Sequence, residues 1–292
     1  MYKTRAALRG LPISASDKPS TMLSRLPLLL LILAVVFGSC GPWVEAIRYD
    51  LADVASQDGD PSDSKMVVMF QVIDKTPANS RFKNEIGYDH ARQVLNEADY
   101  FVLGLLKQFP IQRGYLGGTL TVESFAGCEN TSGPVKVANS TGNHIRLNSD
   151  YIDNFKGDVK AEFDGIVYHE ITRVWMWNGQ GKAPNWLVSG IADYVRLKSG
   201  HPSKDWPNRW SGLSWTDGYA VTAYFIDYCS QIHEGFVAEL NTMMKTCYSD
   251  EYFVKLLGKS VDNLWNDYKC SYMANAASTP ALAPAPSAKH GW

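Results

Sequence analysis

The chain has 292 residues, of which 45% are hydrophobic and 20% are charged, as expected for a soluble globular protein with a sizeable buried core. Lysine and arginine number 28 against 30 aspartates and glutamates, so the formal net charge is −2. This balance gives no electrostatic reason to bind nucleic acid, and we exclude nucleic acid as a partner.

An uninterrupted apolar run, LPLLLLILAVVF, occupies residues 26–37 near the N-terminus. It is too short to span a bilayer and has the length of a signal-peptide core, with a membrane anchor as the alternative. Small residues around Ala46 supply a cleavage site, so we predict a signal peptide over residues 1–46, with Met22 as a possible true start. We expect residues 47–65 to precede the fold, and the mature chain to be secreted, extracellular or apoplastic.

The next elements alternate between strand and helix. Residues 66–72 (MVVMFQV) are apolar and β-branched, which predicts a buried strand. Apolar residues recur at spacings of three and four over residues 86–106, which predicts an amphipathic helix. Residues 119–123 and 144–148 alternate in polarity and predict two strands. The second strand is short and polar on one side, as edge strands are.

The second half of the chain is predicted to be helical. Apolar spacing favours helices over residues 159–177 and 186–197. Residues 212–218 predict a loop, and the remaining chain to Lys269 is expected to be mostly helical. Residues 271–292 are rich in alanine, proline and serine and predict a disordered tail. Strands and one helix come first and helices follow, so we expect an α+β fold.

Two sequons, which begin at Asn130 and Asn139, lie in a polar, glycine-containing stretch that predicts a loop. Both asparagines are candidates for N-glycosylation if the chain is secreted.

Cleavage after residue 46 would leave Cys128, Cys229, Cys247 and Cys270. An even number in an oxidising compartment predicts up to two disulfides, and three pairings are open. Cys247–Cys270 is the first choice, because it would join the last two helical segments. The absence of a Cys-x-x-Cys motif argues against a cysteine-bound zinc.

The sequence HEITRVW at residues 169–175 resembles the start of a His-Glu-x-x-His zinc motif. In that motif two histidines, one helical turn apart, bind zinc, and the glutamate acts as general base on the metal-bound water. His169 and Glu170 fit the pattern. Arg173 occupies the position of the second histidine, and arginine cannot bind zinc because its guanidinium stays protonated.

The context of this motif is FDGIVYHEITRVWMWNGQGKAPNWLVSGIADYVRLK, at residues 163–198. It closely resembles the plant basic secretory protein family, secreted zincin-like peptidases of plants and bacteria that are linked with plant defence. Further matches include RFKNEIGYDHARQVL (81–95) and YFVKLLGKSVDNLWNDYK (252–269). The resemblance covers about residues 66–270, which we take as one domain.

The resemblance implies a zincin-like fold in which the edge strand of a mixed sheet lies over a cleft, with the motif helix beneath it. It makes His169 a metal ligand and Glu170 the general base. The family pattern has glutamate where this chain has Ser189, and by analogy with other zincins that glutamate is the third ligand. Asp193 could be a ligand or support one. Tyr219 could stabilise an oxyanion, or it could be a packed aromatic.

Two arrangements are open for Arg173. In the first, its guanidinium replaces the charge of the missing metal and pairs with Glu170, three residues earlier, and with Asp193. A carboxylate buried without such a partner would be costly. In the second, Arg173 points to solvent.

We therefore predict a non-catalytic homologue of a zinc peptidase, without a cofactor. It would bind a peptide, protein or cell-wall ligand in the cleft, in plant defence or at the cell wall. One alternative is an active peptidase that holds zinc with a non-standard ligand set. Another is a carbohydrate-binding protein that uses tryptophans such as Trp175, Trp177 and Trp186, although core packing also explains them.

Overall fold

The computed structural model describes residues 69–277, apart from residues 109, 115–116 and 126–135. The predictions for residues 1–46 and 47–65 lie outside the described residues, as do Asn130 and Cys128. A four-stranded sheet comes first, with strand order β1-β2-β4-β3. Its strands are β1 (Met69–Asp74), β2 (Gly117–Glu123), β3 (Ala138–Thr141) and β4 (His144–Asn148). β1, β2 and β4 run parallel and β3 is antiparallel to β4, so the sheet is mixed.

Helices make up most of the remaining structure, which confirms the α+β class. A π-helical turn (Phe82–Ile86) and a 3-10 turn (Pro110–Arg113) flank the first long helix. The α-helices are α3 (Tyr88–Leu106), α4 (Ser149–Asn154), α5 (Val159–Trp175), α6 (Asn185–Lys198), α7 (Tyr219–Ile232), α8 (Phe236–Met243), α9 (Glu251–Leu257) and α10 (Val261–Ala277). α10 thus covers the first residues of the segment that we expected to be a tail. Alanines at 274, 276 and 277 favour helix, and residues 278–292 lie outside the description.

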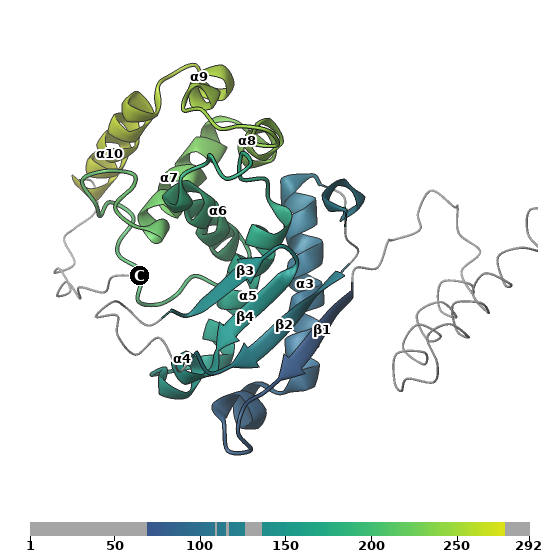
Figure 1. Cartoon of the computed structure of the whole chain (residues 1–292). Coiled ribbons are helices and arrows are strands. Elements are labelled where there is room, and N and C mark those ends of the chain that lie inside the picture. The colour runs from purple at the N-terminus through teal and green to yellow at the C-terminus, as the bar shows by residue number, and fades with distance from the viewer. Residues whose placement is uncertain (1–68, 109, 115–116, 126–135, 278–292) are drawn as a thin grey trace, which may run out of the picture. The chain divides into compact units, whose positions relative to one another are not determined.

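α3 and α5 lie against one face of the sheet, and α6 to α10 group together beyond α5 (Figure 1). The alternation seen in the sequence explains the covered face, since side chains of a strand point alternately to its two sides. Leu120 and Val122 of β2 are buried beneath the helices, together with Ile145 and Leu147 of β4.

The prediction that residues 144–148 form the edge strand is wrong. β4 lies between β2 and β3, and the edge on that side is β3, which contains the Asn139 sequon that we expected in a loop. The polar side chains of β4 have another cause: His144 and Arg146 are exposed on the face of the sheet opposite the helices. Arg146 Nε donates to Glu123 Oε1 of β2 at 2.5 Å.

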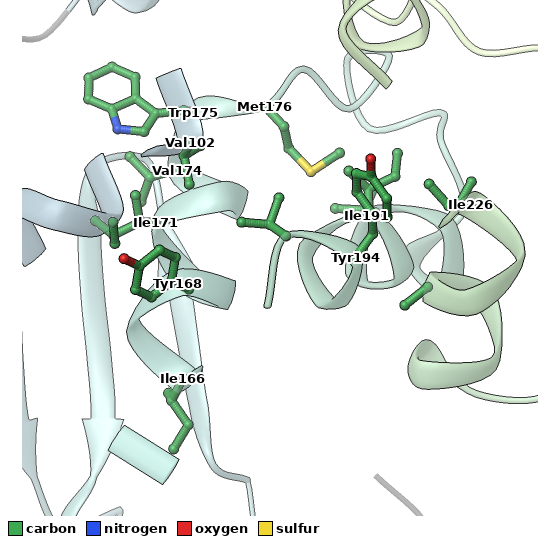
Figure 2. Close-up of a cluster of buried hydrophobic side chains, with 14 of the residues drawn as sticks. Val102, Ile166, Tyr168, Ile171, Val174, Trp175, Met176, Ile191, Tyr194 and Ile226 are labelled. Atoms are coloured by element: carbon green, nitrogen blue, oxygen red, sulfur yellow. The ribbon is translucent and has the colours of Figure 1, made fainter. Parts of the chain in front are cut away.

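The helical half is held together by a core that continues from α3 through α5 and α6 to α7. Figure 2 shows Val102 of α3 near the last turns of α5, and Ile191 of α6 near Ile226 of α7. α6 and α7 approach closely at Gly190, where an added Cβ would lie 2.3 Å from the Thr222 side chain. A larger residue at Gly190 would therefore push these helices apart.

A buried carboxylate joins α3 to α5. Asp99 is only 6% exposed, and its Oδ1 accepts a hydrogen bond from Nε1 of the fully buried Trp175 at 2.6 Å. Burial raises the pKa of Asp99 to about 6, and the Trp175 hydrogen bond, which favours the charged form, offsets part of that rise. The ionised carboxylate is therefore costly for the folded state at neutral pH.

Replacing Asp99 with Asn is expected to stabilise the protein by about 2 kcal/mol at pH 7, because the amide oxygen still accepts from Trp175 and carries no charge. The folded-state pKa is raised, so the wild-type carboxyl costs stability only as the pH rises from its unfolded value through about 6. The advantage of Asp99→Asn should shrink towards zero near pH 4. Urea unfolding at both pH values measures it, and an advantage independent of pH would contradict this assignment.

The prediction of a Cys247–Cys270 disulfide is wrong. Cys229, Cys247 and Cys270 are all free thiols in the described part of the chain. Cys229 is buried in α7, and this burial raises the pKa of its thiol, while Cys270 is exposed on α10. The sulfur of Cys247 lies instead 2.7 Å from the Tyr252 hydroxyl. An even number of cysteines does not bring two of them close enough for a disulfide. The distances between their Cα and Cβ atoms decide whether a pair can form.

Candidate functional site

A cavity of about 360 Å³ lies between the edge of the sheet, α5 and α6, a size typical of ligand sites. Its lining residues come from four parts of the chain: Lys136, Val137, Ala138 and Asn139 in and before β3; Ile166, His169, Glu170 and Arg173 on α5; Asn185, Ser189, Asp193 and Arg196 on α6; and Tyr219 at the start of α7. The edge strand thus borders a cleft above the motif helix, as the family resemblance implied.

Helical spacing brings the predicted site residues together. His169 and Arg173 are one turn apart on α5, and Glu170 shares their face of the helix. On α6, Ser189 and Asp193 are likewise four residues apart. α5 is fixed at its start by Asp158, whose side chain accepts from the backbone N–H of Ala161 at 3.0 Å.

His169 and Asp193 form a pair across the two helices. Nδ1 of His169 lies 2.7 Å from Oδ1 of Asp193. An ionised carboxylate only accepts hydrogen bonds, so the proton of the neutral imidazole is on Nδ1. Nε2 then presents a lone pair, and no described residue engages it. Asp193 therefore orients His169.

Arg173 bonds to the other helix, and the predicted ion pair with Glu170 or Asp193 is wrong. Its Nη1 donates to Ser189 Oγ at 2.7 Å and lies 3.5 Å from Asn185 Oδ1. The i,i+3 spacing allowed contact with Glu170, but the long side chain extends across the cleft. Arg173 is half-buried, so the alternative of a side chain free in solvent does not describe it either.

Glu170 is buried at the cavity wall without a partner. It is 5% exposed, and its Oε2 has no hydrogen-bond partner in the described part of the chain. A buried oxygen of this kind is costly unless a donor reaches it. Such an atom indicates a place where a ligand or a water supplies the missing hydrogen bond.

Tyr219 and Asn185 close the far side of the cavity. The Tyr219 hydroxyl accepts a hydrogen bond from Asn185 Nδ2 at 2.9 Å, so its own proton is free to be donated. Tyr219 is half-buried and lines the cavity, which places it at the site. Sequence reasoning gave Asn185 no role, although it lies four residues before Ser189, directly before the predicted helix.

A buried ion pair below the cavity was also missed. Arg196 Nη2 lies 3.2 Å from Glu162 Oε2, and each side chain is 4% exposed. Gly165 makes room for it, since a Cβ there would lie 2.4 Å from the guanidinium. Arg196 follows Ser189 by seven residues, so helical spacing placed it on the cavity face. No comparable spacing in the sequence indicated that Glu162, its partner on α5, would lie beside it.

Residues 65–268 match the family described as "Peptidase of plants and bacteria". The chain belongs to this family. The basic secretory protease of Boswellia serrata is 38% identical to this chain over 65 residues, which are 22% of this chain and 77% of that relative. No solved structure matches the chain. The family assignment confirms the resemblance drawn from residues 66–270.

The side chains at this peptidase-family site do not fit a three-ligand zinc centre. Catalytic zinc takes three protein ligands from histidine, cysteine, aspartate and glutamate. Residues 69–277, where described, hold no group of three or more such side chains that could bind one ion. At the positions where the resemblance implied ligands, Arg173 offers no lone pair, and the Ser189 hydroxyl accepts from Arg173.

None of the tryptophans proposed as a sugar platform lines the cavity. Trp175 is fully buried, and Trp186 packs edge-to-face on Trp215 with ring centroids 4.0 Å apart. Trp177 is half-buried, and the guanidinium of Arg113 lies over its ring, 4.4 Å from the ring centroid. These contacts favour the packing interpretation.

Among the described helices, none is long and apolar enough to cross a membrane.

Proposed function

We propose that the chain is a secreted, zincin-like member of its family that binds a peptide segment of a ligand without cleaving it, in plant defence or at the cell wall. The observation that carries this proposal is the 2.7 Å hydrogen bond from Arg173 to Ser189. These two residues stand where the family pattern has ligands, and in this chain they bond to each other. A cationic side chain thus takes the region where the family resemblance places a metal cation.

The edge strand supports a peptide as the ligand. β3 pairs with β4 along one side, and no described strand pairs with its other side. An extended peptide can add to such an edge through main-chain hydrogen bonds, and pockets for its side chains then give specificity. The residues before and within β3 line the cavity, so an added strand would pass directly over it.

An active peptidase with a non-standard ligand set is the second candidate, and the His169–Asp193 pair favours it. Histidines that bind metals commonly donate their other ring N–H to a carboxylate, as His169 does at 2.7 Å. This pair alone supplies one ligand, and a single imidazole does not retain zinc against competing chelators. We therefore place non-catalytic binding first.

Metal analysis of the purified secreted protein tests the proposal. We expect much less than one zinc per chain after dialysis, no chelator-sensitive cleavage of a mixed peptide substrate, and a melting temperature unchanged by chelator. An authentic zinc peptidase handled in parallel controls for metal loss during purification. Stoichiometric zinc together with chelator-sensitive cleavage would establish the second candidate instead.

A further inference from the structure

Three residues that line the cavity carry acceptor atoms without a hydrogen-bond partner in the described structure. Oε2 of Glu170 is buried and receives no hydrogen bond from the described residues, and the same is true of Oδ1 of Asn139 on the edge strand. In the neutral imidazole, Nε2 of His169 adds a third lone pair, because Nδ1 donates to Asp193. All three residues line the same cavity. A ligand that donates several hydrogen bonds would satisfy these acceptors.

An ammonium group meets this requirement, since it carries three N–H donors and no acceptor. Its charge also suits Glu170, whose buried carboxylate has no cationic partner among the described residues. A sugar hydroxyl offers one donor and no charge. A ligand carboxylate would bring a second negative charge beside Glu170, which disfavours that class.

Arg173 offers hydrogen-bond donors, so it requires an acceptor on the ligand. Only its Nη1 is used, by Ser189 and Asn185, so Nε and Nη2 remain without partners in the described structure. Glu170 and Arg173 lie three residues apart on α5, and both line the cavity. A ligand that uses both residues carries a hydrogen-bond acceptor as well as an ammonium group.

The α-amino group and the first carbonyl oxygen of a peptide supply both, and they are separated by only the Cα and carbonyl carbons. A lysine ammonium lies at the end of a four-carbon stem and would leave Arg173 unused. Building on the proposed function, we propose that the cleft binds the free amino terminus of a peptide. Its ammonium donates to Glu170, and its first carbonyl oxygen accepts from Arg173.

Two peptide pools test this inference on the full secreted chain. One is an equimolar mixture of Xaa-Ala-Ala-amides with a free amino terminus, and the other is the same mixture N-acetylated. We expect the free pool to bind about ten-fold more tightly or better, because a hydrogen bond to a charged group is worth about 1.5–3 kcal/mol. Native mass spectrometry of the mixtures, followed by calorimetry on the best peptide, measures the ratio.

Variants assign the effect to residues. Glu170→Gln should reduce the preference for the free amino terminus to within about two-fold, since the amide removes the charge at almost the same shape. Arg173→Met should weaken both pools alike, because both carry the first carbonyl. Glu251→Gln, an exposed position on α9, should keep the wild-type ratio. Thermal unfolding of each variant confirms that it is folded.

The outcomes separate the two proposals. Equal binding of the free and acetylated pools would overturn recognition of the amino terminus and leave peptide binding standing. Failure of both pools to bind at millimolar concentration would overturn both proposals. A free-pool preference that survives Glu170→Gln would also reject the role given to Glu170. The wild-type comparison needs no variant, so it remains decisive even if Glu170→Gln does not fold.

Discussion

Replacing Arg173 with His and Ser189 with Glu in the same chain is expected to create a protein that retains about one zinc per molecule. His169 and the new histidine would be one turn apart on α5. Position 189 faces position 173 from α6, since Arg173 bonds to Ser189 at 2.7 Å. Two imidazoles, one carboxylate and an open fourth position form the usual ligand set of a catalytic zinc. Glu170 would then lie beside that open position, and we expect peptide cleavage that a chelator abolishes.

Further variants show whether the gain comes from this geometry. Adding His169→Ala to the double variant should remove the zinc. Arg173→His alone should hold zinc only weakly, because it supplies two ligands. Ser189→Glu alone should hold none, because the new carboxylate would pair with Arg173. Metal analysis after dialysis, with circular dichroism to confirm folding, gives the answer. A folded double variant that binds no zinc would show that α5 and α6 no longer converge as the family resemblance implies.

Removing one partner of the buried ion pair beneath the cavity is expected to lower the free energy of unfolding substantially. Arg196→Met would leave Glu162 as a buried charge whose remaining hydrogen bond comes from Tyr151, at 3.1 Å. The expected cost is about 3 kcal/mol, because an uncompensated buried charge is far more costly than a missing surface pair. Denaturant unfolding at pH 7 measures this loss.

The double replacement Arg196→Met with Glu162→Leu should recover most of the loss, since apolar side chains of similar size often replace a buried ion pair at little cost. Lys259→Met, which breaks the exposed pair with Asp267, is the matched control and should change stability little. If Arg196→Met proves as mild as Lys259→Met, water must reach the Arg196–Glu162 pair.

Local patterns predicted the helices that carry the site and much of their common face. Apolar spacing placed α5 and α6, and the i,i+4 relation put His169 beside position 173. This spacing does not determine the direction in which the Arg173 side chain extends. The pairing with Ser189 joins two helices, and its geometry depends on how they pack, which a spacing within one helix does not contain. The expected Arg173–Glu170 pair failed for this reason.

The sheet shows the same division between local and tertiary information. Alternation gave β2 and β4 correctly, because it reports which side of a strand is buried. It did not give their order, since an exposed polar face and an unpaired edge produce similar sequences. β3 is short, lies directly before β4 and carries polar side chains, so its sequence resembles a loop. Its place at the edge became visible only in the assembled sheet.

The mutual bond between Arg173 and Ser189 also bears on how such a chain can evolve. Each residue supports the other, so replacing one of them with a metal-binding residue removes a contact and adds at most one ligand. A three-ligand set at this place in the cavity therefore arises only when both residues change together.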